Sequence, residues 1–174
     1  CTQSRVDIKR FKKVGKPIGR GANGVIYKVQ DTETKNIYAA KKITSEYNEE
    51  SLNREIGILM YANHPTIIKF YGFSLLDLND EDNVTLLMEL AENGSLLDIL
   101  NKIRSDRIIE NYDNTNRQII LIGISRGMKY LHDRNIIHRD LKPGNVLLGK
   151  NFEPHITDFG MSKFFQVDDS KNQS

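Results

Sequence analysis

The feature that most constrains this chain is one short polar run near its C-terminal end, Ile137-His138-Arg139-Asp140-Leu141-Lys142-Pro143-Gly144-Asn145. It places a carboxylate, an ammonium group and a carboxamide within six positions, on a segment that Pro143 and Gly144 prevent from forming a regular helix. A second carboxylate follows in Asp158-Phe159-Gly160, after a stretch long enough for one hairpin. Such a set of groups suits a site that handles phosphate and a divalent cation.

Transfer of a phosphoryl group asks little covalent chemistry of a protein, because most of the rate gain comes from positioning and charge neutralisation. An Asp can orient an acceptor hydroxyl and take its proton, while Asn and Asp oxygens can hold Mg²⁺. For any one of these residues the alternative is a solvated turn with local hydrogen bonds. The joint pattern favours the phosphate site.

The run HRDLKPGN followed by DFG resembles the catalytic loop and the metal-binding turn of protein kinases. The resemblance implies that Asp140 is the catalytic base, that Lys142 contacts phosphate, and that Asn145 and Asp158 bind Mg²⁺. ATP and Mg²⁺ are then the expected cofactors. Lys142, two positions after the Asp, implies protein substrates with Ser or Thr acceptors. The chain is therefore expected to be a protein serine/threonine kinase.

The composition of the chain argues against several other classes of protein. The 174 residues are 39% hydrophobic and 28% charged, which is typical of a globular protein, and the net charge of +2 gives no reason to expect nucleic-acid binding. Cys1 is the only cysteine, so neither an intramolecular disulfide nor a cysteine zinc site is predicted. No signal peptide and no membrane span is predicted, and a cytoplasmic location is the default expectation.

A glycine-rich segment with the spacing GxGxxG occupies residues 19–24. In a dinucleotide-binding domain this loop opens a helix, whereas here Val25 to Val29 has strong β-propensity and a turn-like segment follows. The loop is therefore predicted to join two strands, the first from Phe11 to Gly19, as in the phosphate-covering loop of kinases. An ordinary flexible hairpin is the alternative for the loop considered alone. Asn23 stands where many kinases carry an aromatic residue.

The next predicted strand, from Ile37 to Ile43, contains two adjacent lysines that must point to opposite faces. The kinase pattern implies that Lys41 faces the nucleotide, and Lys42 is interpreted as a solvated surface charge. A helix is predicted from Glu49 to Ala62, with a buried stripe formed by Leu52, Ile56 and Leu59. Glu55 borders that stripe, and the resemblance implies that it anchors Lys41; Glu49 and Glu50 are assigned to the helix dipole.

Two further strands, near residues 69–76 and 84–90, and a short link at 91–95 precede helices predicted at 96–103 and 114–133. The last helix carries the stripe Ile120, Ile124, Met128 and Leu131, with more apolar residues on its other faces. By resemblance the link is a hinge, and Met88 lies behind the adenine. The resemblance assigns nucleotide contacts to Ile18, Gly19, Arg20, Gly21, Ala22, Asn23, Gly24, Ile26, Ala39, Lys41, Glu89, Ala91, Ser95 and Leu147.

The expected fold is α+β and bilobal, like a protein kinase, with a complete small β-rich lobe that carries one main helix, and the first part of a helical large lobe. The expected division is a lead-in at 1–10, the small nucleotide-binding lobe at 11–90, the hinge at 91–95, and a partial large lobe at 96–174 that ends inside the activation segment. We expect a fragment of a longer kinase, with weak activity on its own. The alternative is a pseudokinase or nucleotide-binding scaffold.

Two further expectations concern the subgroup of kinases that the chain resembles and the regulation of its activity. The phrases Asn93-Gly94-Ser95-Leu96 and ITDFGMSK at 156–163 resemble the tyrosine-kinase-like branch of Ser/Thr kinases. Arg139, beside the expected base, predicts regulation by phosphorylation of the activation loop, because an Arg can pair with a phosphate and order the loop. An upstream activating kinase is then an expected partner, and Ser162 and Ser170 are the nearby hydroxyls.

Overall fold

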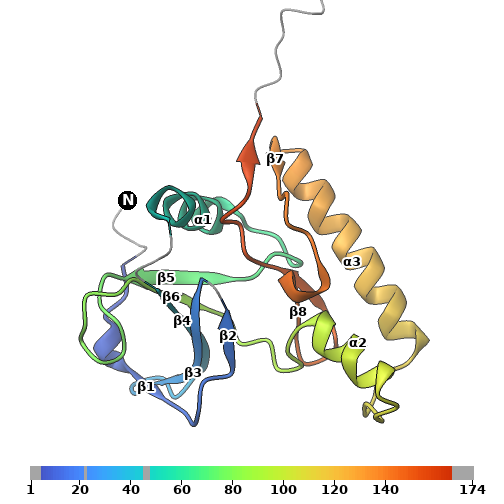
Figure 1. The fold of residues 1–174 in the computed structure, drawn as a ribbon, viewed down its shortest axis with the longest axis horizontal. Coiled ribbons are helices and arrows are strands. Elements are labelled where there is room, and N and C mark those ends of the chain that lie inside the picture. The colour runs from blue at the N-terminus through green and yellow to red at the C-terminus, as the bar shows by residue number, and fades with distance from the viewer. Residues whose placement is uncertain (1–4, 22, 45–47, 166–174) are drawn as a thin grey trace, which may run out of the picture. The chain divides into compact units, whose positions relative to one another are not determined.

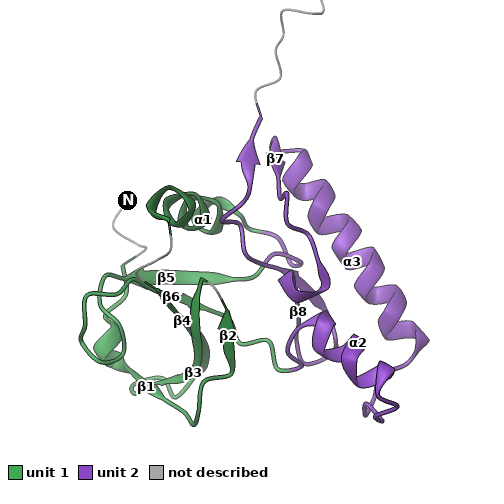
Figure 2. Ribbon diagram, viewed as in Figure 1, with its two compact units in different colours: residues 1–63, 68–92 green, residues 64–67, 93–174 purple. Residues whose placement is uncertain are grey.

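The computed structural model describes residues 5–21, 23–44 and 48–165. The chain divides into two compact units, coloured green and purple in Figure 2. The first unit comprises residues 1–63 and 68–92, and the second comprises residues 64–67 and 93–174. The first is an antiparallel sheet with one helix and the second is mainly helical, so the predicted α+β class is confirmed. Within the described ranges, no helix has the length and apolar character needed to cross a membrane.

The sheet of the first unit has six strands, all antiparallel to their neighbours (Figure 1). In chain order they are β1 (Phe11–Lys13), β2 (Gly19–Gly21), β3 (Gly24–Asp31), β4 (Ile37–Ile43), β5 (Phe70–Ser74) and β6 (Thr85–Met88). The order across the sheet is β1-β3-β4-β6-β5, and β2 pairs with β3 beside β1. Every residue of the long central strand β4 pairs with β3, so this strand is fixed along its whole length.

The single strand predicted from Phe11 to Gly19 is wrong, because the structure has two short strands there. Both pair with β3, β1 at its far end and β2 beside the glycine loop. Gly15 separates them with a φ of +76°, a left-handed conformation that a β-strand cannot contain, and Pro17 has no N–H to donate to a ladder. The alternating pattern thus indicated extended chain in this segment but not the interruption at Gly15.

Residues 5–10, expected to be a polar lead-in, are packed on the sheet. Asp7 caps a 3₁₀ turn, η1 (Ile8–Arg10), by accepting the N–H of Lys9, and the Ile8 side chain is buried. The Arg10 guanidinium lies 2.7 Å from the carboxylate of buried Asp31, the last residue of β3. This segment therefore helps to cover the side of the sheet where Val29, Ala40 and Leu87 form a core cluster, a cluster that Val6 and Phe11 also contact.

The single helix of this unit, α1 (Glu49–Tyr61), begins at Asn48, whose side chain accepts the N–H of Ser51. Its buried residues are Glu55, Ile58 and Leu59. The helix was predicted correctly, but the centre of its buried face was not, because Leu52 and Ile56 are only half-buried. A carboxylate rather than an aliphatic side chain occupies the middle of the buried face.

The second unit combines two helices with two small antiparallel pairs of strands. Its elements are α2 (Leu96–Arg104), α3 (Asn114–His132), β7 (Ile136–Ile137), a 3₁₀ turn η2 (Pro143–Asn145), β8 (Val146–Leu148), β9 (Pro154–Ile156) and β10 (Lys163–Phe164). Strand β7 pairs with β10, and β8 pairs with β9. Buried side chains from α2, α3 and the β8–β9 hairpin form the core, namely Ile99, Ile120, Val146, Leu148 and Phe152.

Helix α3 packs through glycines as much as through its apolar stripe. Its buried residues are Ile120, Gly123, Gly127 and Leu131, whereas the expected stripe members Ile124 and Met128 are only half-buried. A Cβ on Gly123 would lie 2.3 Å from Pro154 Cγ, and one on Gly127 would lie 2.6 Å from Thr66 Oγ1. The two glycines therefore allow β9 and the 64–67 segment to approach the helix backbone closely.

Candidate active site

The first group of candidate residues is an ion pair inside the first unit. Lys41 Nζ on β4 lies 2.7 Å from Glu55 Oε1 on α1, and the two side chains are only 11% and 1% exposed. The buried position of Glu55 on the helix and the register of β4 bring these groups together. A buried pair of this kind contributes little net stability, because desolvation offsets the attraction, but it holds the ammonium group in one place.

The glycine loop joins β2 and β3 next to this pair. Gly19 pairs with Ile26, and Ile26 pairs with Lys41, so these three residues share one face of the sheet. Ala39 lies two residues before Lys41, on the same face. Gly24 has a φ of +150°, and a Cβ there would lie 2.2 Å from the Lys42 carbonyl oxygen. The loop can therefore close onto β4 only with glycine at this position.

Other predicted nucleotide contacts have different surroundings. Arg20 is paired with Val25, and therefore lies on the opposite face from Lys41. Ile18 is exposed and donates its backbone N–H to the Ile26 carbonyl. Gly21 ends β2 and Asn23 lies in the turn that follows, whereas Ala22 falls outside the described residues.

The residues expected at the hinge follow β6. Glu89 accepts the backbone N–H of Lys69 through its carboxylate, and Ala91 is half-buried beyond it. Ser95, expected at the ribose, is the N-cap of α2, and its hydroxyl donates to Asp98 Oδ2 at 2.6 Å. Its backbone forms a bridge with Leu147 in the second unit. To contact a ribose, the Ser95 hydroxyl would have to form a further hydrogen bond besides the one to Asp98.

The second group of candidate residues is the loop at residues 138–145, which lies within the second unit. Asp140 Oδ2 accepts hydrogen bonds from Lys142 Nζ at 2.7 Å and from Asn145 Nδ2 at 2.9 Å. Asn145 Nδ2 also donates to the Asp140 backbone carbonyl at 2.8 Å. The structure thus brings together three of the four residues that the sequence pattern singled out. Because the Asn145 amide nitrogen faces Asp140, its Oδ1 is left as a possible ligand for a cation.

Charge in this loop favours an ionised carboxylate. The hydrogen bond from Lys142 lowers the pKa of Asp140 from its ordinary value, and it outweighs the opposing effect of burial. The same contact raises the pKa of Lys142. Asp140 is therefore a carboxylate at neutral pH, able to accept a hydrogen bond from a hydroxyl group.

Sequence reasoning gave no role to His138, which fixes the loop from within. Its imidazole is fully buried, it packs against Phe159 with ring centroids 5.1 Å apart, and burial lowers its pKa. Nε2 lies 3.0 Å from the Thr157 carbonyl, and Nδ1 lies 3.3 Å from the Asp140 N–H. A carbonyl can only accept and an N–H can only donate, so Nε2 carries the proton and Nδ1 accepts. The one available signal was its position directly after the apolar pair Ile136-Ile137.

His138 also joins the loop to the segment that carries Asp158. The Thr157 N–H donates to the Asn145 carbonyl at 3.0 Å, so the backbone of Thr157 has hydrogen bonds to both His138 and Asn145. Asp158 follows directly, with a φ of +65°, an uncommon backbone conformation for a residue other than glycine. The structure therefore ties Asp158 to Asp140 and Asn145 through backbone contacts of its neighbour. Asp158 and Asn145 supply a carboxylate and an amide oxygen, a donor set that suits Mg²⁺.

Two residues beside the loop were expected to take part in regulation. Arg139 has a φ of +64°, and its Nε donates to the Met161 carbonyl at 2.6 Å. Ser162, one of the two nearby hydroxyls, is fully buried and donates to the His138 carbonyl at 3.3 Å. In this conformation Ser162 is inaccessible to a modifying enzyme. Ser170 lies outside the described residues.

Comparison with known proteins gives a consistent answer. Residues 12–174 match the family described as "Protein kinase domain". The chain is 32% identical over 155 residues to Aurora kinase A-A of Xenopus laevis, covering 86% of this chain and 36% of that protein. It is 32% identical over 169 residues to the serine/threonine-protein kinase Aurora-1 of Arabidopsis thaliana, covering 93% and 53%.

A receptor-like protein kinase of Ipomoea nil is 38% identical over 152 residues, covering 84% of this chain and 13% of that protein. The matched region thus spans about a third of the Xenopus relative, half of the Arabidopsis relative and a smaller share of the Ipomoea relative. The family match extends over nearly the whole chain and includes the glycine loop, Lys41, Asp140 and Asp158. The chain belongs to the protein kinase family.

Proposed function

We propose that this chain carries the catalytic residues of an ATP-dependent protein kinase that transfers the γ-phosphate of ATP to Ser or Thr hydroxyls of proteins. The observation that carries the proposal is the Asp140 carboxylate, which is held by Lys142 and Asn145 and kept ionised by Lys142. Its hydrogen-bond partners leave it one oxygen, Oδ1, for an incoming hydroxyl. Similarity to serine/threonine-protein kinase Aurora-1 supports Ser or Thr as the acceptor.

In the proposed reaction Asp140 orients the substrate hydroxyl and accepts its proton. The hydroxyl oxygen forms a bond to the γ-phosphorus, while the bond from that phosphorus to the bridging β–γ oxygen breaks and ADP leaves. A carboxylate with a lowered pKa is a weak base, so its main contribution is orientation of the hydroxyl, with proton transfer late in the reaction. Lys142 is close enough to Asp140 to neutralise charge on the transferred phosphoryl group.

On the nucleotide side we propose that Lys41 contacts ATP phosphates and that the backbone N–H groups of residues 19–24 cover them. Glu55 then serves to hold Lys41, as their 2.7 Å contact supports. We propose that Ala39 borders the adenine, and that Glu89 and Ala91 offer it backbone hydrogen bonds. Contacts from Ile18, Ile26, Ser95 and Leu147 remain part of the same proposal.

Asn145 and Asp158 are the residues that would hold Mg²⁺. Both offer hard oxygen ligands, and Mg²⁺ usually takes one or two carboxylates together with substrate phosphates and water. When bound, the cation neutralises negative charge on the phosphate oxygens. His138 contributes by fixing the backbone of Asp140 and of Thr157, next to the two groups that must act together.

The test is Asp140→Asn in the full-length polypeptide, assayed for Mg²⁺-dependent transfer of phosphate from ATP to a generic Ser/Thr protein. We expect transfer to fall roughly 10²-fold or more, with ATP binding retained. Asp133→Asn is the matched control, because Asp133 also pairs with a lysine, Lys129, but at the exposed C-terminal end of α3. If the wild type binds ATP and transfers nothing, the chain is a nucleotide-binding scaffold and the proposal fails.

Wider features of the function are proposals of the same kind. We propose protein substrates, a cytoplasmic location, and control by a phosphate that pairs with Arg139 after release of its contact with Met161. The division into a small lobe at 11–90, a hinge at 91–95 and a large-lobe portion from 96 belongs with these proposals. Phosphatase treatment of the purified protein tests the control, since unchanged activity would refute it.

A further inference from the structure

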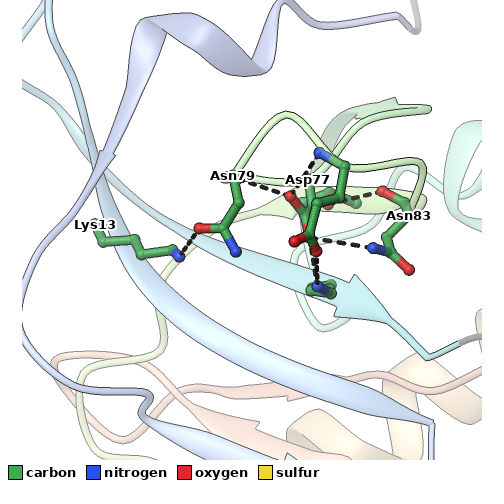
Figure 3. A network of polar contacts seen from close by, with 7 residues as sticks. Lys13, Asp77, Asn79 and Asn83 are labelled. Carbon is green, nitrogen blue, oxygen red and sulfur yellow. Dashed lines mark hydrogen bonds and ion pairs between the residues drawn. The ribbon is translucent and has the colours of Figure 1, made fainter.

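A buried carboxylate organises the polar loop between β5 and β6, residues 77–83, which we call the 77–83 loop. Asp77 is 1% exposed, and its Oδ1 accepts the backbone N–H groups of Asn79 at 2.7 Å and Glu81 at 3.2 Å. Its Oδ2 accepts from Asn83 Nδ2 at 3.2 Å, so the carboxylate lies at the centre of the loop (Figure 3). The loop therefore has one defined shape, fixed from inside.

The remaining partner of Asp77 is Lys42, the residue after Lys41. Lys42 Nζ forms an ion pair with Asp77 Oδ2 and lies 3.2 Å from Glu81 Oε2. Burial alone would raise the pKa of Asp77, but the hydrogen bonds from Lys42 and the loop backbone lower it to about 2. Asp77 raises the pKa of Lys42 in turn. The ammonium group of Lys42 is thus held by two carboxylates, and the interpretation of Lys42 as a solvated surface charge is wrong.

Lys41 and Lys42 are held by carboxylates on opposite faces of one strand. Lys41 pairs with Ile26 and Leu86 in the neighbouring strands, and Lys42 pairs with Val25 and Thr85 one step further along. One residue further, the Ile43 N–H donates to the Val84 carbonyl at 2.8 Å, and Ile43 pairs with Gly24 of β3. Besides these backbone contacts, the side chains at the end of β4 are held by α1 through Glu55 and by the 77–83 loop through Asp77.

We propose that Asp77 and Lys42 are positioning residues for Lys41, and that their ion pair sets the orientation in which β4 presents Lys41 to Glu55 and to the nucleotide. This inference rests on the proposed function. A rotation of the strand end by about 10° would move an ammonium group about 6 Å from the axis by about 1 Å, and such a displacement can cost much of a rate. The pair acts through Lys41 and has no contact with substrate.

The test compares Lys42→Met and Asp77→Asn with the wild type in the full-length polypeptide. The quantities are kcat per nucleotide-binding molecule, KM for ATP, KM for the protein substrate, and the thermal midpoint. We expect kcat to fall about 5- to 20-fold, with KM for the protein substrate unchanged. A lower midpoint with wild-type kcat per nucleotide-binding molecule would mean that the pair is only structural, and would overturn the inference.

Lys13→Met is the matched control. Lys13 also binds the 77–83 loop, through Asn79 Oδ1 at 2.6 Å, but at an exposed position far in sequence from Lys41. Its removal should leave kcat at the wild-type value. A loss equal to that of Lys42→Met would show that any loosening of the loop has the same effect, and would also overturn the inference.

A second comparison separates this inference from the proposed function. If Asp77 acts through Lys41, adding Asp77→Asn to a Lys41→Met variant should cause no further loss of residual activity, whereas an equal loss in both backgrounds contradicts the inference. A wild type without transfer activity would refute only the proposed function. The ion pair is then judged from thermal midpoints of Asp77→Asn, Glu55→Gln and the double variant: non-additive shifts support the coupling and additive shifts overturn it.

Discussion

Lys41 and Lys42 are consecutive residues of strand β4, and the ammonium group of each is paired with a different buried carboxylate. Glu55 of α1 binds Lys41, and Asp77 of the 77–83 loop binds Lys42. The alternation of a β-strand directs the two side chains to opposite faces, so one strand receives an anchor from each side. This arrangement makes the position of Lys41 depend on residues that are distant in sequence.

The first prediction concerns Glu55→Gln. The amide keeps the size of the side chain but removes the charge that faces the Lys41 ammonium, so Lys41 loses its fixed position. We expect kcat/KM for ATP to fall roughly 10²-fold, measured by steady-state phosphate transfer. A variant with wild-type kinetics would show that Lys41 is positioned without Glu55.

Glu50→Gln is the control for this prediction. Glu50 lies on the same helix and pairs with Arg54, but its side chain is 81% exposed. Exposed pairs contribute less than about 1 kcal/mol to stability, so this variant should keep both stability and activity.

The helices and strands could largely be predicted from local signals. Asn48 before α1, Ser95 before α2 and Asp113 before α3 are N-cap residues whose side chains accept backbone N–H groups of the first turn. These bonds depend on residues three apart, so the sequence displays them directly. The loop chemistry at Asp140 and Asn145 is local for the same reason, since both residues lie within one short turn.

Contacts between residues distant in sequence could not be predicted from local patterns, and the Lys41–Glu55 pair was expected only through the resemblance to kinases. Asp77 lies in a run of polar residues that reads as a solvated loop, and nothing local marks it as the partner of Lys42. Gly123 and Gly127 fall on the buried face of α3, whereas the pattern of apolar residues predicted that Ile124 and Met128 are buried. In both cases the cause is a close approach of another segment, which only the folded chain reveals.

The second prediction concerns these two glycines. A methyl group at Gly127 would meet Thr66 and Ile156, and one at Gly123 would meet Pro154, all closer than 3 Å. We expect Gly127→Ala and Gly123→Ala each to lower the free energy of unfolding by about 2 kcal/mol, because overpacking forces the neighbours apart. Urea denaturation followed by circular dichroism measures the change.

Gly57→Ala is the control for the glycine variants. Gly57 lies inside α1, is exposed, and would bring its Cβ within 4 Å of no atom outside its own helix. Alanine has a higher helix propensity than glycine, so this variant should be more stable by about 0.5–1 kcal/mol. Destabilisation of all three variants alike would mean that helix geometry, and not contact with Thr66 or Pro154, sets the cost.

The third prediction concerns pH. Burial lowers the pKa of His138 and of His64, so the folded chain binds fewer protons at these sites than the unfolded chain does. Stability is therefore complete above the unfolded value of about 6.5 and is lost as the pH falls below it. We expect the free energy of unfolding to decrease between pH 7.5 and 5.5, measured by denaturant titrations at several pH values. The His64→Gln variant should lose part of this dependence, and an unchanged slope would contradict the assignment to His64.

The fourth prediction concerns the charge beside Asp140. The hydrogen bond from Lys142 lowers the pKa of Asp140, so Lys142→Met should raise that pKa. Asp140 acts as a carboxylate, and activity is lost as the pH falls through its pKa, so the acid limb of the rate profile should move to higher pH in the variant. Stopped assays of phosphate transfer from pH 4.5 to 8 measure this shift. Lys129→Met is the control, because Lys129 pairs with Asp133 at the exposed C-terminal end of α3. An acid limb that stays in place when Lys142 is removed would mean that Asp140 is not the group that titrates.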